Sequence, residues 1–422
     1  MTEGRLNMAV IGSGGRGLWV LGHEFIRRTG DVRVLGFCDP RPGLRENVDW
    51  IASDMAEKGS PLDYEIMTTT DHEELLGLPD LDFVLLATPN HLHAGYAEAI
   101  CDSGAGMLIE KPLAVNVRDL NRIVAAEARS GVKVFVGFCM RYNRLFERAK
   151  QIVSSGRIGA PKLVSFQDYF ALGRGYFRGR NRFERFSGGL LVEKACHSFD
   201  IMSWLVDSDP VRTSCFGKLS VFTPRKGAGE NCAECSLRDG CPDASVRRDD
   251  SGAETGALCV YNSQKDVDDT DALLIEYASG AVASYVECFY SPTIERRFSI
   301  VGDEGELVAS AERAFIEHRR LGEDKWTREA IEYNPGGHRG ADPRMVTAAI
   351  RYFRGEAGDE IKVDSEAGRM SVLTAMAAQR SSKEGRTVTI AEMAADETAG
   401  AFGDEAPEDL DYDVQRGRGG TY

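Results

Sequence analysis

The sequence is short of basic residues relative to acidic ones, and it has no long apolar run. It holds 51 Lys and Arg against 66 Asp and Glu, a formal net charge of −15. Because nucleic acids are bound by basic surfaces, this balance argues against a nucleic-acid partner. No stretch approaches the roughly 18 apolar residues of a membrane span, and the polar start MTEGRLNMAVI lacks the pattern of a signal peptide. We therefore expect a cytoplasmic protein without a membrane partner.

Disulfides are also not expected, because the ten cysteines of a cytoplasmic chain should be mostly reduced. The length of 422 residues is enough for two or three domains. The composition, 42% hydrophobic and 28% charged, is that of an ordinary globular protein.

A glycine-rich turn follows the first apolar run. The segment RLNMAVI at 5–11 reads as a strand, GSGGRG comes directly after it, and a helix is predicted over 15–29. The spacing G-x-G-x-x-G allows a tight turn, a close approach of pyrophosphate to the backbone, and close packing of the helix on the sheet. The helix N-terminus would add its amides and dipole. The predicted cofactor-binding residues of this turn are Gly12, Ser13, Gly14, Gly15, Arg16 and Gly17.

An acidic residue ends the second predicted strand, DVRVLGFCD. Asp39 lies 22 residues after Gly17, about where the acid that hydrogen-bonds the adenosine ribose is found in dinucleotide-binding domains. Its charge would repel a 2′-phosphate, so NAD is favoured over NADP, and the neighbouring Arg41 weakens this preference. The alternative is a glycine-rich turn that holds no cofactor.

Further strands follow at 81–88, 106–111 and 132–138, with helix-like segments between them, as in a doubly wound parallel sheet. Ligands of such sheets bind at the carboxyl ends of the strands. Two of these ends carry polar residues, in ATPNHLHAGYA (87–97) and EKPLA (110–114).

These motifs, in this order, resemble the glucose–fructose oxidoreductase / inositol dehydrogenase / MocA family. The matching segments are AVIGSGGRG, CDP, ATPNHLHAGYA, EKPLA, RYN at 141–143, the helix that carries His197, and the weaker RRFSIVGDEGEL (296–307) and SKEGRTVTI (382–390). Together they cover the chain to about residue 392.

The resemblance implies a Rossmann domain over 1–138 and an α+β domain with an open, mainly antiparallel sheet over 139–392. Members transfer a hydride between a sugar or cyclitol carbon and NAD(P), and their second-domain sheets often pair, which implies a homodimer or homotetramer. Lys111 and His197 match the family's catalytic pair. The resemblance further implies cofactor contacts from Thr88, Pro89, Asn90, His93, Glu110 and Lys111, and substrate contacts from Lys111, Arg141 and Tyr142. His93 could equally cap or pack the helix start.

The segment VEKACHSFD (192–200) lies on a helix predicted over 190–206. At about 100° per residue, Glu193, His197 and Asp200 form one polar stripe on an otherwise apolar helix. A histidine suits the removal of a hydroxyl proton, and a carboxylate one turn away can orient it or hold a substrate hydroxyl. Members resembling inositol dehydrogenase carry aspartate where this chain has Glu193, so the hydroxyl that is held should differ. The alternative is a buried polar network that only fixes the helix.

An arginine-rich loop, LGRGYFRGRNRFERFSGG, precedes that helix. Guanidinium groups in a pocket would suit an anionic substrate, and we expect at least one of Arg178, Arg180 and Arg182 to contact it, with Tyr176 nearby. The alternative is that these arginines are solvated or pair with surface acids.

A cysteine cluster lies in a polar insertion at about 224–268. Cys232, Cys235 and Cys241 have the spacing C-x2-C-x5-C, and Cys259 follows. Four thiols could form a tetrahedral structural zinc site. An iron–sulfur cluster would use similar ligands, and reduced, packed thiols are the other alternative.

The predicted function is an NAD-dependent dehydrogenase of a sugar, sugar acid or cyclitol. One alternative is a glycoside hydrolase that oxidises its substrate transiently with bound NAD, acts on an anionic sugar glycoside such as a sulfosugar, and makes no net NADH. Another is an NAD-binding regulator without activity. The last segment, 393–422, is acidic and is expected to be a poorly ordered tail. The alternative is an arm that packs on a neighbouring subunit.

Overall fold

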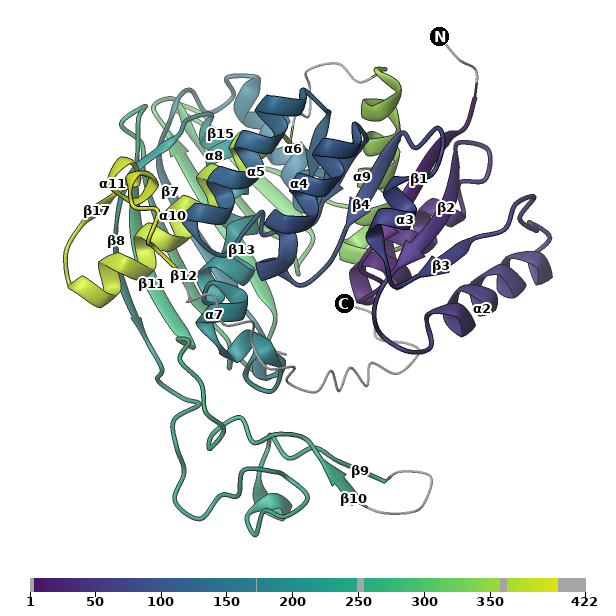
Figure 1. The fold of residues 1–422 in the computed structure, drawn as a ribbon. Coiled ribbons are helices and arrows are strands. Elements are labelled where there is room, and N and C mark those ends of the chain that lie inside the picture. The colour runs from purple at the N-terminus through teal and green to yellow at the C-terminus, as the bar shows by residue number, and fades with distance from the viewer. Residues whose placement is uncertain (1–3, 172, 249–253, 357–362, 401–422) are drawn as a thin grey trace. The chain divides into compact units, whose positions relative to one another are not determined.

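The computed structural model describes residues 4–171, 173–248, 254–356 and 363–400 (Figure 1). Within these ranges the chain forms two compact units, one of residues 4–147 and 332–369, the other of residues 148–331 and 370–400. Residues 332–369, which the sequence places in the second domain, thus group with the N-terminal unit. The helix α10, Ser365–Glu384, passes from one unit into the other.

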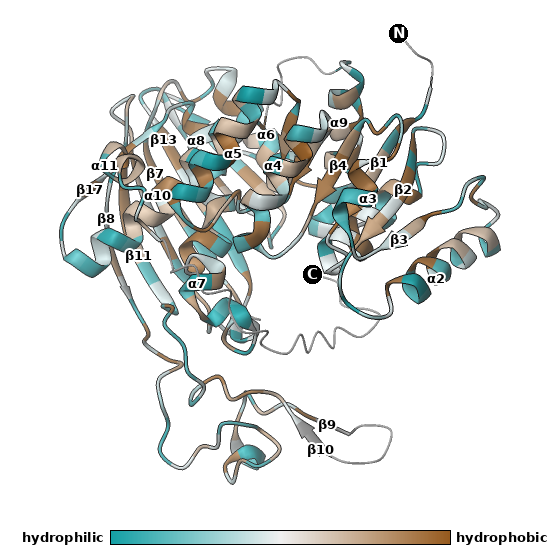
Figure 2. Cartoon of the chain, in the orientation of Figure 1, coloured by the Kyte–Doolittle hydropathy of each residue, from teal (hydrophilic) through white to brown (hydrophobic). Residues whose placement is uncertain are grey.

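The N-terminal unit is built on a six-stranded parallel sheet of order β3-β2-β1-β4-β5-β6. The strands are β1 Leu6–Ile11, β2 Val32–Cys38, β3 Met67–Thr69, β4 Phe83–Leu86, β5 Gly106–Ile109 and β6 Val134–Val136. Their residues are mostly buried, as expected when helices cover both faces, and the hydrophobic colour of β1 and β4 is clear in Figure 2. This strand order is that of dinucleotide-binding domains, so the predicted doubly wound sheet is confirmed.

The helical segments of this unit connect the parallel strands up to residue 130 and follow the last strand from residue 139 onward. They are η1 Gly15–Gly22, α1 His23–Ile26, α2 Leu44–Glu57, α3 His72–Leu76, η2 Asn90–Leu92, α4 His93–Ser103, α5 Val117–Ser130, η3 Cys139–Tyr142, the start of α6 Arg144–Ser154, and α9 Gly337–Arg354. The helix predicted over 15–29 is a π-helix followed by one α-helical turn. A Cβ on Gly22 would lie 2.2 Å from the carbonyl oxygen of Gly17, so the wide turn depends on glycine.

The second unit contains a nine-stranded sheet of order β16-β15-β14-β13-β7-β12-β11-β8-β17. The strands are β7 Pro161–Tyr169, β8 Pro210–Lys218, β11 Thr270–Tyr277, β12 Val282–Cys288, β13 Glu295–Gly302, β14 Gly305–Ser310, β15 Phe315–Arg320, β16 Thr327–Ala330 and β17 Val388–Thr389. Among these described strands only β7 and β12 pair in parallel, so the predicted, mainly antiparallel sheet is confirmed.

One face of this sheet packs on α8, Cys196–Val206, and on α10. Phe199 of α8 stacks edge-on against Tyr285 of β12 at 5.1 Å, and the Ser381 hydroxyl of α10 accepts a hydrogen bond from the Cys215 amide of β8. Other short elements of the unit are η4 Gly173–Phe177, η5 Arg180–Arg182, α7 Glu184–Ser187, the π-helix η6 Leu191–Ala195 and α11 Ile390–Ala395.

Between β8 and β11 the chain leaves the sheet as an insertion, residues 219–268, with little regular structure. Its described elements are η7 Arg238–Gly240, β9 Val246–Arg248 and β10 Glu254–Gly256. The predicted tail lies mostly outside the described residues; of its described part, Asp396 pairs with Arg380 of α10 at 2.6 Å. No helix in the described ranges is both long and apolar enough to cross a membrane.

Candidate functional site

The glycine turn after β1 is shaped for close backbone approach. Gly12 has φ +96°, and a Cβ there would lie 2.6 Å from the backbone of Ala87 and Thr88. A Cβ on Gly17 would lie 1.7 Å from the Gly12 carbonyl oxygen. At Gly14, by contrast, the nearest atom to an added Cβ is a guanidinium nitrogen of Arg41 at 3.9 Å. The backbone of Gly14 is therefore open on the side from which a pyrophosphate would approach, and the predicted turn fits a dinucleotide.

Asp39 follows β2 and holds the turn. Its carboxylate accepts hydrogen bonds from the Ser13 amide at 2.6 Å and from Arg41 Nε at 2.7 Å. Burial works to raise the pKa of Asp39, but the hydrogen bonds from Arg41 and Ser13 outweigh it and hold the pKa below its usual value. The carboxylate is thus charged at neutral pH and fixed where a ribose hydroxyl could meet it, with Arg41 against it.

Arg16 connects the glycine turn to the EKP segment. Its guanidinium lies 2.9 Å from a Glu110 oxygen and 3.0 Å from an Asp342 oxygen. Burial favours a lower pKa for Arg16, but the carboxylates of Glu110 and Asp342 outweigh this effect and raise the pKa above its usual value. Asp342 also contacts His338 Nδ1 at 2.9 Å. Arg16 and Glu110 are both predicted to contact the cofactor, and in the structure they form an ion pair with each other.

His93 connects the ends of β4 and β5. The ring is fully buried, with Nδ1 3.0 Å from the Pro112 carbonyl oxygen and Nε2 3.2 Å from that of Thr88. Burial lowers the pKa of His93, and the hydrogen bonds to the backbone carbonyls oppose this effect in part. Of the two roles left open by the sequence, packing at the helix start fits this geometry: His93 positions the two loops that carry Thr88 and Lys111.

Arg141 and Tyr142, two of the predicted substrate contacts of this unit, are buried in η3. The Tyr142 carbonyl accepts a hydrogen bond from Arg344 at 2.8 Å, which fixes the segment to α9.

In the second unit, the helix predicted over 190–206 begins as the π-helix η6 and continues as α8. π-Turns inside helices are frequent at functional sites. The wide turn falls at Glu193, whose carboxylate accepts a weak hydrogen bond from Asn181 at 3.4 Å, while His197 and Asp200 lie on α8 and are buried. The angle of Glu193 therefore differs from that of a regular helix, because a π-helix advances by less than 100° per residue, and the smaller advance keeps Glu193 on the side of the helix that carries His197.

The chain enters this helix through a glycine pair and is held by α10. Gly189 has φ +86°, and a Cβ there would lie 1.6 Å from the Gln379 side-chain nitrogen. The Cys196 carbonyl, at the change from π- to α-helix, accepts a hydrogen bond from the Ser371 hydroxyl at 2.7 Å. Two contacts from one neighbouring helix therefore fix where Glu193 and His197 stand.

A layer of buried acids lies on the sheet face that α8 covers. Ser198 donates to Asp168 at 2.7 Å, Arg296 pairs with Asp168 at 2.9 Å, and the Tyr285 hydroxyl donates to Glu287 at 2.9 Å. Burial raises the pKa of Asp271 to about 8 and that of Glu287 well above its usual range. Asp271 stands two residues from Leu273 and Glu287 two residues from Tyr285, so each acid shares a strand face with a buried residue. The sequence does not reveal this layer, because polar residues in a strand with alternating hydrophobicity are normally taken to face solvent.

The arginine loop is mostly bound within its own unit. Arg174 pairs with Asp243 at 3.0 Å, Arg178 donates to the Asp243 carbonyl, and Arg182 donates to the Gln264 carbonyl at 3.0 Å. Burial lowers the pKa of Arg182. Two of the three predicted substrate arginines therefore fasten the loop to the insertion, and Tyr176 packs edge-on against Phe289 at 5.4 Å. Arg180, the third of these arginines, lies on η5.

The four cysteines of the insertion line one cavity, but they do not form the predicted zinc site. All four lie in the described part of the chain, and no three of them bring their sulfur atoms within 4.8 Å of one another. Tetrahedral zinc with bonds of about 2.3 Å would require sulfurs roughly 3.8 Å apart. The zinc prediction is therefore not supported, because the loops hold the thiols too far apart for a single ion.

A different group, Cys139, His338 and Asp342, does bring its ligand atoms within 4.8 Å. Because Arg16 lies against Asp342, a cation here would meet a positive charge, and we read the group as a hydrogen-bonded network. The signal for it was the glycine-rich GGHRGAD at 336–342, where His338 and Arg339 have positive φ.

Comparisons with known proteins agree with this geometry. Residues 6–138 match the oxidoreductase family NAD-binding Rossmann fold, and residues 150–390 match the C-terminal alpha/beta domain of the same family. The chain belongs to the Gfo/Idh/MocA oxidoreductase family. It is 27% identical to the putative oxidoreductase YteT of Bacillus subtilis over 360 residues, 76% of this chain and 84% of that protein.

Other members of the Gfo/Idh/MocA family are similar over most of the chain. The Myo-inositol 2-dehydrogenase of Thermotoga maritima is 23% identical over 341 residues, 76% of this chain and 84% of that protein. The structure of a levoglucosan dehydrogenase in complex with NADH superposes with a TM-score of 0.69 at 18% identity, covering 92% of this chain and 99% of that one. The chain is therefore an oxidoreductase with an NAD-binding Rossmann domain.

Proposed function

We propose that this protein is an NAD-dependent dehydrogenase that acts on a hydroxyl-bearing carbon of a sugar, sugar acid or cyclitol. The observation that carries the proposal is that this family member combines two features. One is an open glycine turn beside Asp39, a charged carboxylate suited to a ribose hydroxyl. The other is the buried His197 on a helix that also carries Glu193. The similarity to inositol 2-dehydrogenases and to a levoglucosan dehydrogenase supports the substrate class.

The cofactor would be held by residues of the N-terminal unit. The glycine turn at Gly12–Gly17 would bind the pyrophosphate, Asp39 the adenosine ribose, and the loop Thr88–Asn90 the nicotinamide half. Bound NAD would supply the hydride acceptor. Asp39 and the Arg16–Glu110 pair are fixed before the cofactor binds, which lowers the entropic cost of ordering them.

The proton is proposed to move through this chain's own residues. His197 takes the hydroxyl proton of the substrate as general base, and Glu193 orients the substrate through a hydroxyl. Lys111 stabilises the oxygen as negative charge develops on it. Asp200 and Arg180 would add polar contacts to the substrate.

Substitution of His197 tests the assignment. His197→Ala should lower kcat at least about 100-fold, because removing a general acid–base group usually costs this much, while NAD binding measured by fluorescence titration stays unchanged. His72→Ala, which removes a half-exposed histidine of the other unit, is the control. Turnover within a few-fold of wild type in His197→Ala would overturn the role.

The substrate class is tested on purified protein. Nicotinamide released by denaturation would be quantified first, then a panel of sugars, sugar acids and cyclitols would be incubated with NAD, and aryl glycosides without added cofactor. NADH formation from a free sugar or cyclitol supports the dehydrogenase. Aglycone release without net NADH would replace it with the redox-neutral glycoside hydrolase, and no reaction despite bound nicotinamide would favour the regulator.

We also propose that a second copy of the chain covers the outer face of the nine-stranded sheet. Exposed apolar residues stand on this face in five neighbouring strands: Phe216 of β8, Leu274 of β11, Val282 of β12, Leu163 of β7 and Val301 of β13. Leu163 pairs in register with Val282 and Val301, so these three are contiguous. Such a patch marks an interaction site, and the pairing of second-domain sheets in this family supports a copy of the same chain.

A further inference from the structure

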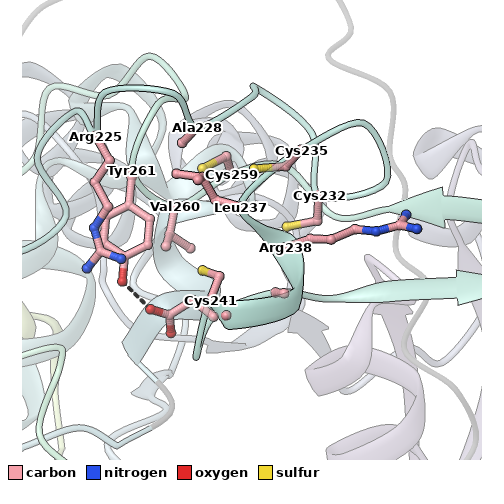
Figure 3. A pocket seen from close by; sticks show the side chains of 13 residues that line it. Arg225, Ala228, Cys232, Cys235, Leu237, Arg238, Cys241, Cys259, Val260 and Tyr261 are labelled. Carbon is pink, nitrogen blue, oxygen red and sulfur yellow. Dashed lines mark hydrogen bonds between the residues drawn. The ribbon is translucent and has the colours of Figure 1, made fainter.

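The insertion at 219–268 holds four cysteines that the proposed function does not use. In Figure 3 the side chains of Cys232, Cys235, Cys241 and Cys259 lie around one cavity. The cavity has a volume of about 290 Å³, several times the share of one water molecule, about 30 Å³. In its described residues the insertion has few strands and helices, and only part of it packs in an apolar cluster, through Phe222, Tyr261 and Val267. Small segments with little core of their own are usually held by disulfides or metals. All ten cysteines lie in the described parts of the chain, and none of them is in a disulfide there.

Local backbone structure places the four thiols around the cavity. Cys232 donates its amide to the Ala257 carbonyl at 2.9 Å, and the Cys259 amide donates to the Glu230 carbonyl at 2.7 Å, so these two lie on adjacent paired segments. Turns carry the chain from Cys232 to Cys235 and on to Cys241. The Gly229 amide donates to Cys235 Sγ at 3.3 Å. Hydrogen bonds from backbone amides to sulfur are typical of metal-bound thiolates and tune them.

The spacing of the sulfurs selects the kind of metal group. Thiolates on one zinc ion must gather within roughly 3.8 Å of each other, and no three of these four lie within 4.8 Å of one another. On a four-iron cube each thiolate binds a different iron, so the sulfurs stand farther apart and surround a volume instead of a point. The ligand set is also all sulfur, because the sequence has no histidine between His197 and His318.

The remaining lining of the cavity suits a group of net negative charge. Ala228, Leu237 and Val260 provide apolar walls, and two arginines, Arg225 and Arg238, also line the cavity. Asp243 is there as well, but its carboxylate is engaged by Arg174 and by the Tyr261 hydroxyl. A cube with four thiolate ligands carries excess negative charge, which the guanidinium groups would balance.

We propose that Cys232, Cys235, Cys241 and Cys259 bind a four-iron, four-sulfur cluster that holds the insertion together. The cluster has a structural role and takes no part in hydride transfer. Through Arg174 and Arg178, which bind Asp243, it also steadies the arginine loop that leads into the helix of His197.

The test is metal and sulfide analysis of the full chain, purified without oxygen from cells supplied with iron and cysteine. The expected result is about four iron and four acid-labile sulfide per chain, with the broad visible absorption of thiolate-bound iron. Incubating metal-free protein without oxygen with ferric iron, sulfide and excess thiol, which reduces part of the iron, should restore the same content. About one zinc per chain with no iron, or no metal after both procedures, would overturn the proposal.

Variants separate a bound cluster from adventitious iron. Cys235→Ser and Cys241→Ser, alone and together, should lower iron and sulfide at least several-fold, whereas Cys288→Ser, in strand β12 outside the insertion, should keep the wild-type content. Equal iron in the double variant and in Cys288→Ser would contradict the site. If the variants do not fold, wild-type protein is treated with a chelator: proteolytic cleavage within 219–268 should accelerate as iron is lost, and an unchanged rate would also contradict it. These measurements do not depend on any enzymatic activity.

Discussion

Several polar side chains around the proposed cofactor site are already bound to one another. Asp39 holds Ser13 and Arg41, Arg16 holds Glu110 and Asp342, and His93 contacts three carbonyl oxygens. Each of these side chains helps to stabilise the fold and also sets the shape of the proposed cofactor site. A substitution should therefore change both the stability and the preference for one cofactor. The residue scale is therefore where cofactor choice and acid sensitivity should be tested.

Asp39 should control the choice between NAD and NADP. Asp39→Ala removes a carboxylate from the ribose position and frees Arg41, which can then pair with a 2′-phosphate. We expect the ratio of the two Kd values to shift toward NADP about tenfold or more. In Asp39→Ala/Arg41→Ala the gain for NADP should disappear. Titration of both cofactors checks this, and an unchanged ratio in Asp39→Ala would refute the assignment.

Asp342 should make the N-terminal unit sensitive to acid. Burial works to raise the pKa of Asp342, but Arg16 and His338 dominate and lower it from 3.8 to about 2. An acid with a lowered folded pKa stabilises the fold above about pH 4, and this contribution is lost as the pH falls through about 2. The shift corresponds to about 2 kcal/mol.

The stability difference between wild type and Asp342→Asn should therefore shrink by about this amount, about 2 kcal/mol, between pH 5 and pH 2. Denaturation followed by circular dichroism over this range measures it. Asp63→Asn, which removes an exposed partner of Arg5, is the control and should show a small difference at every pH because exposed pairs contribute little. A constant gap for Asp342→Asn would contradict the argument.

At the scale of elements, π-turns begin two helices of the proposed site: the helix after the glycine turn and the helix that carries His197. η1 follows the glycine turn, and η6 carries Glu193 directly before α8. At η1 an added Cβ on Gly17 or Gly22 would meet a carbonyl oxygen five residues earlier, and just before η6 an added Cβ on Gly189 would meet Gln379. Sequence periodicity predicts both helices but not the π-turns, because it reports which residues face the core and not the hydrogen-bond pattern of the turn.

Gly189→Ala tests the helix entry. The substitution places a Cβ 1.6 Å from Gln379 Nε2 and forces alanine to φ +86°, which we expect to cost about 1–3 kcal/mol of stability. Gly189→Ala/Gln379→Ala should recover only the part due to the collision. Gly175→Ala, in the same loop with nothing within 4 Å of the added Cβ, is the control. A melting temperature of Gly189→Ala equal to that of Gly175→Ala would show that the entry tolerates a side chain.

At the scale of the whole molecule, the exposed apolar sheet face should decide the oligomeric state. Phe216 is 83% exposed on β8, so Phe216→Asp should leave the fold intact but lower the mass in solution by disrupting the pairing of two copies. Leu321→Asp is the control, because Leu321 is 82% exposed but lies just after β15 and not on this face. Light scattering after gel filtration measures both. Equal masses for wild type and Phe216→Asp would exclude this face.

The sequence by itself determined the family, the doubly wound sheet, the dinucleotide turn and the helix of His197, because these depend on local spacing and strand order. Tertiary structure alone decided how individual side chains are used. The sequence could not show that Arg178 and Arg182 fasten a loop, that Arg16 joins Glu110 to Asp342, or that four cysteines surround a cavity too wide for one zinc ion. Each of these depends on distances between segments tens or hundreds of residues apart, and those distances are set by the packing of the folded units.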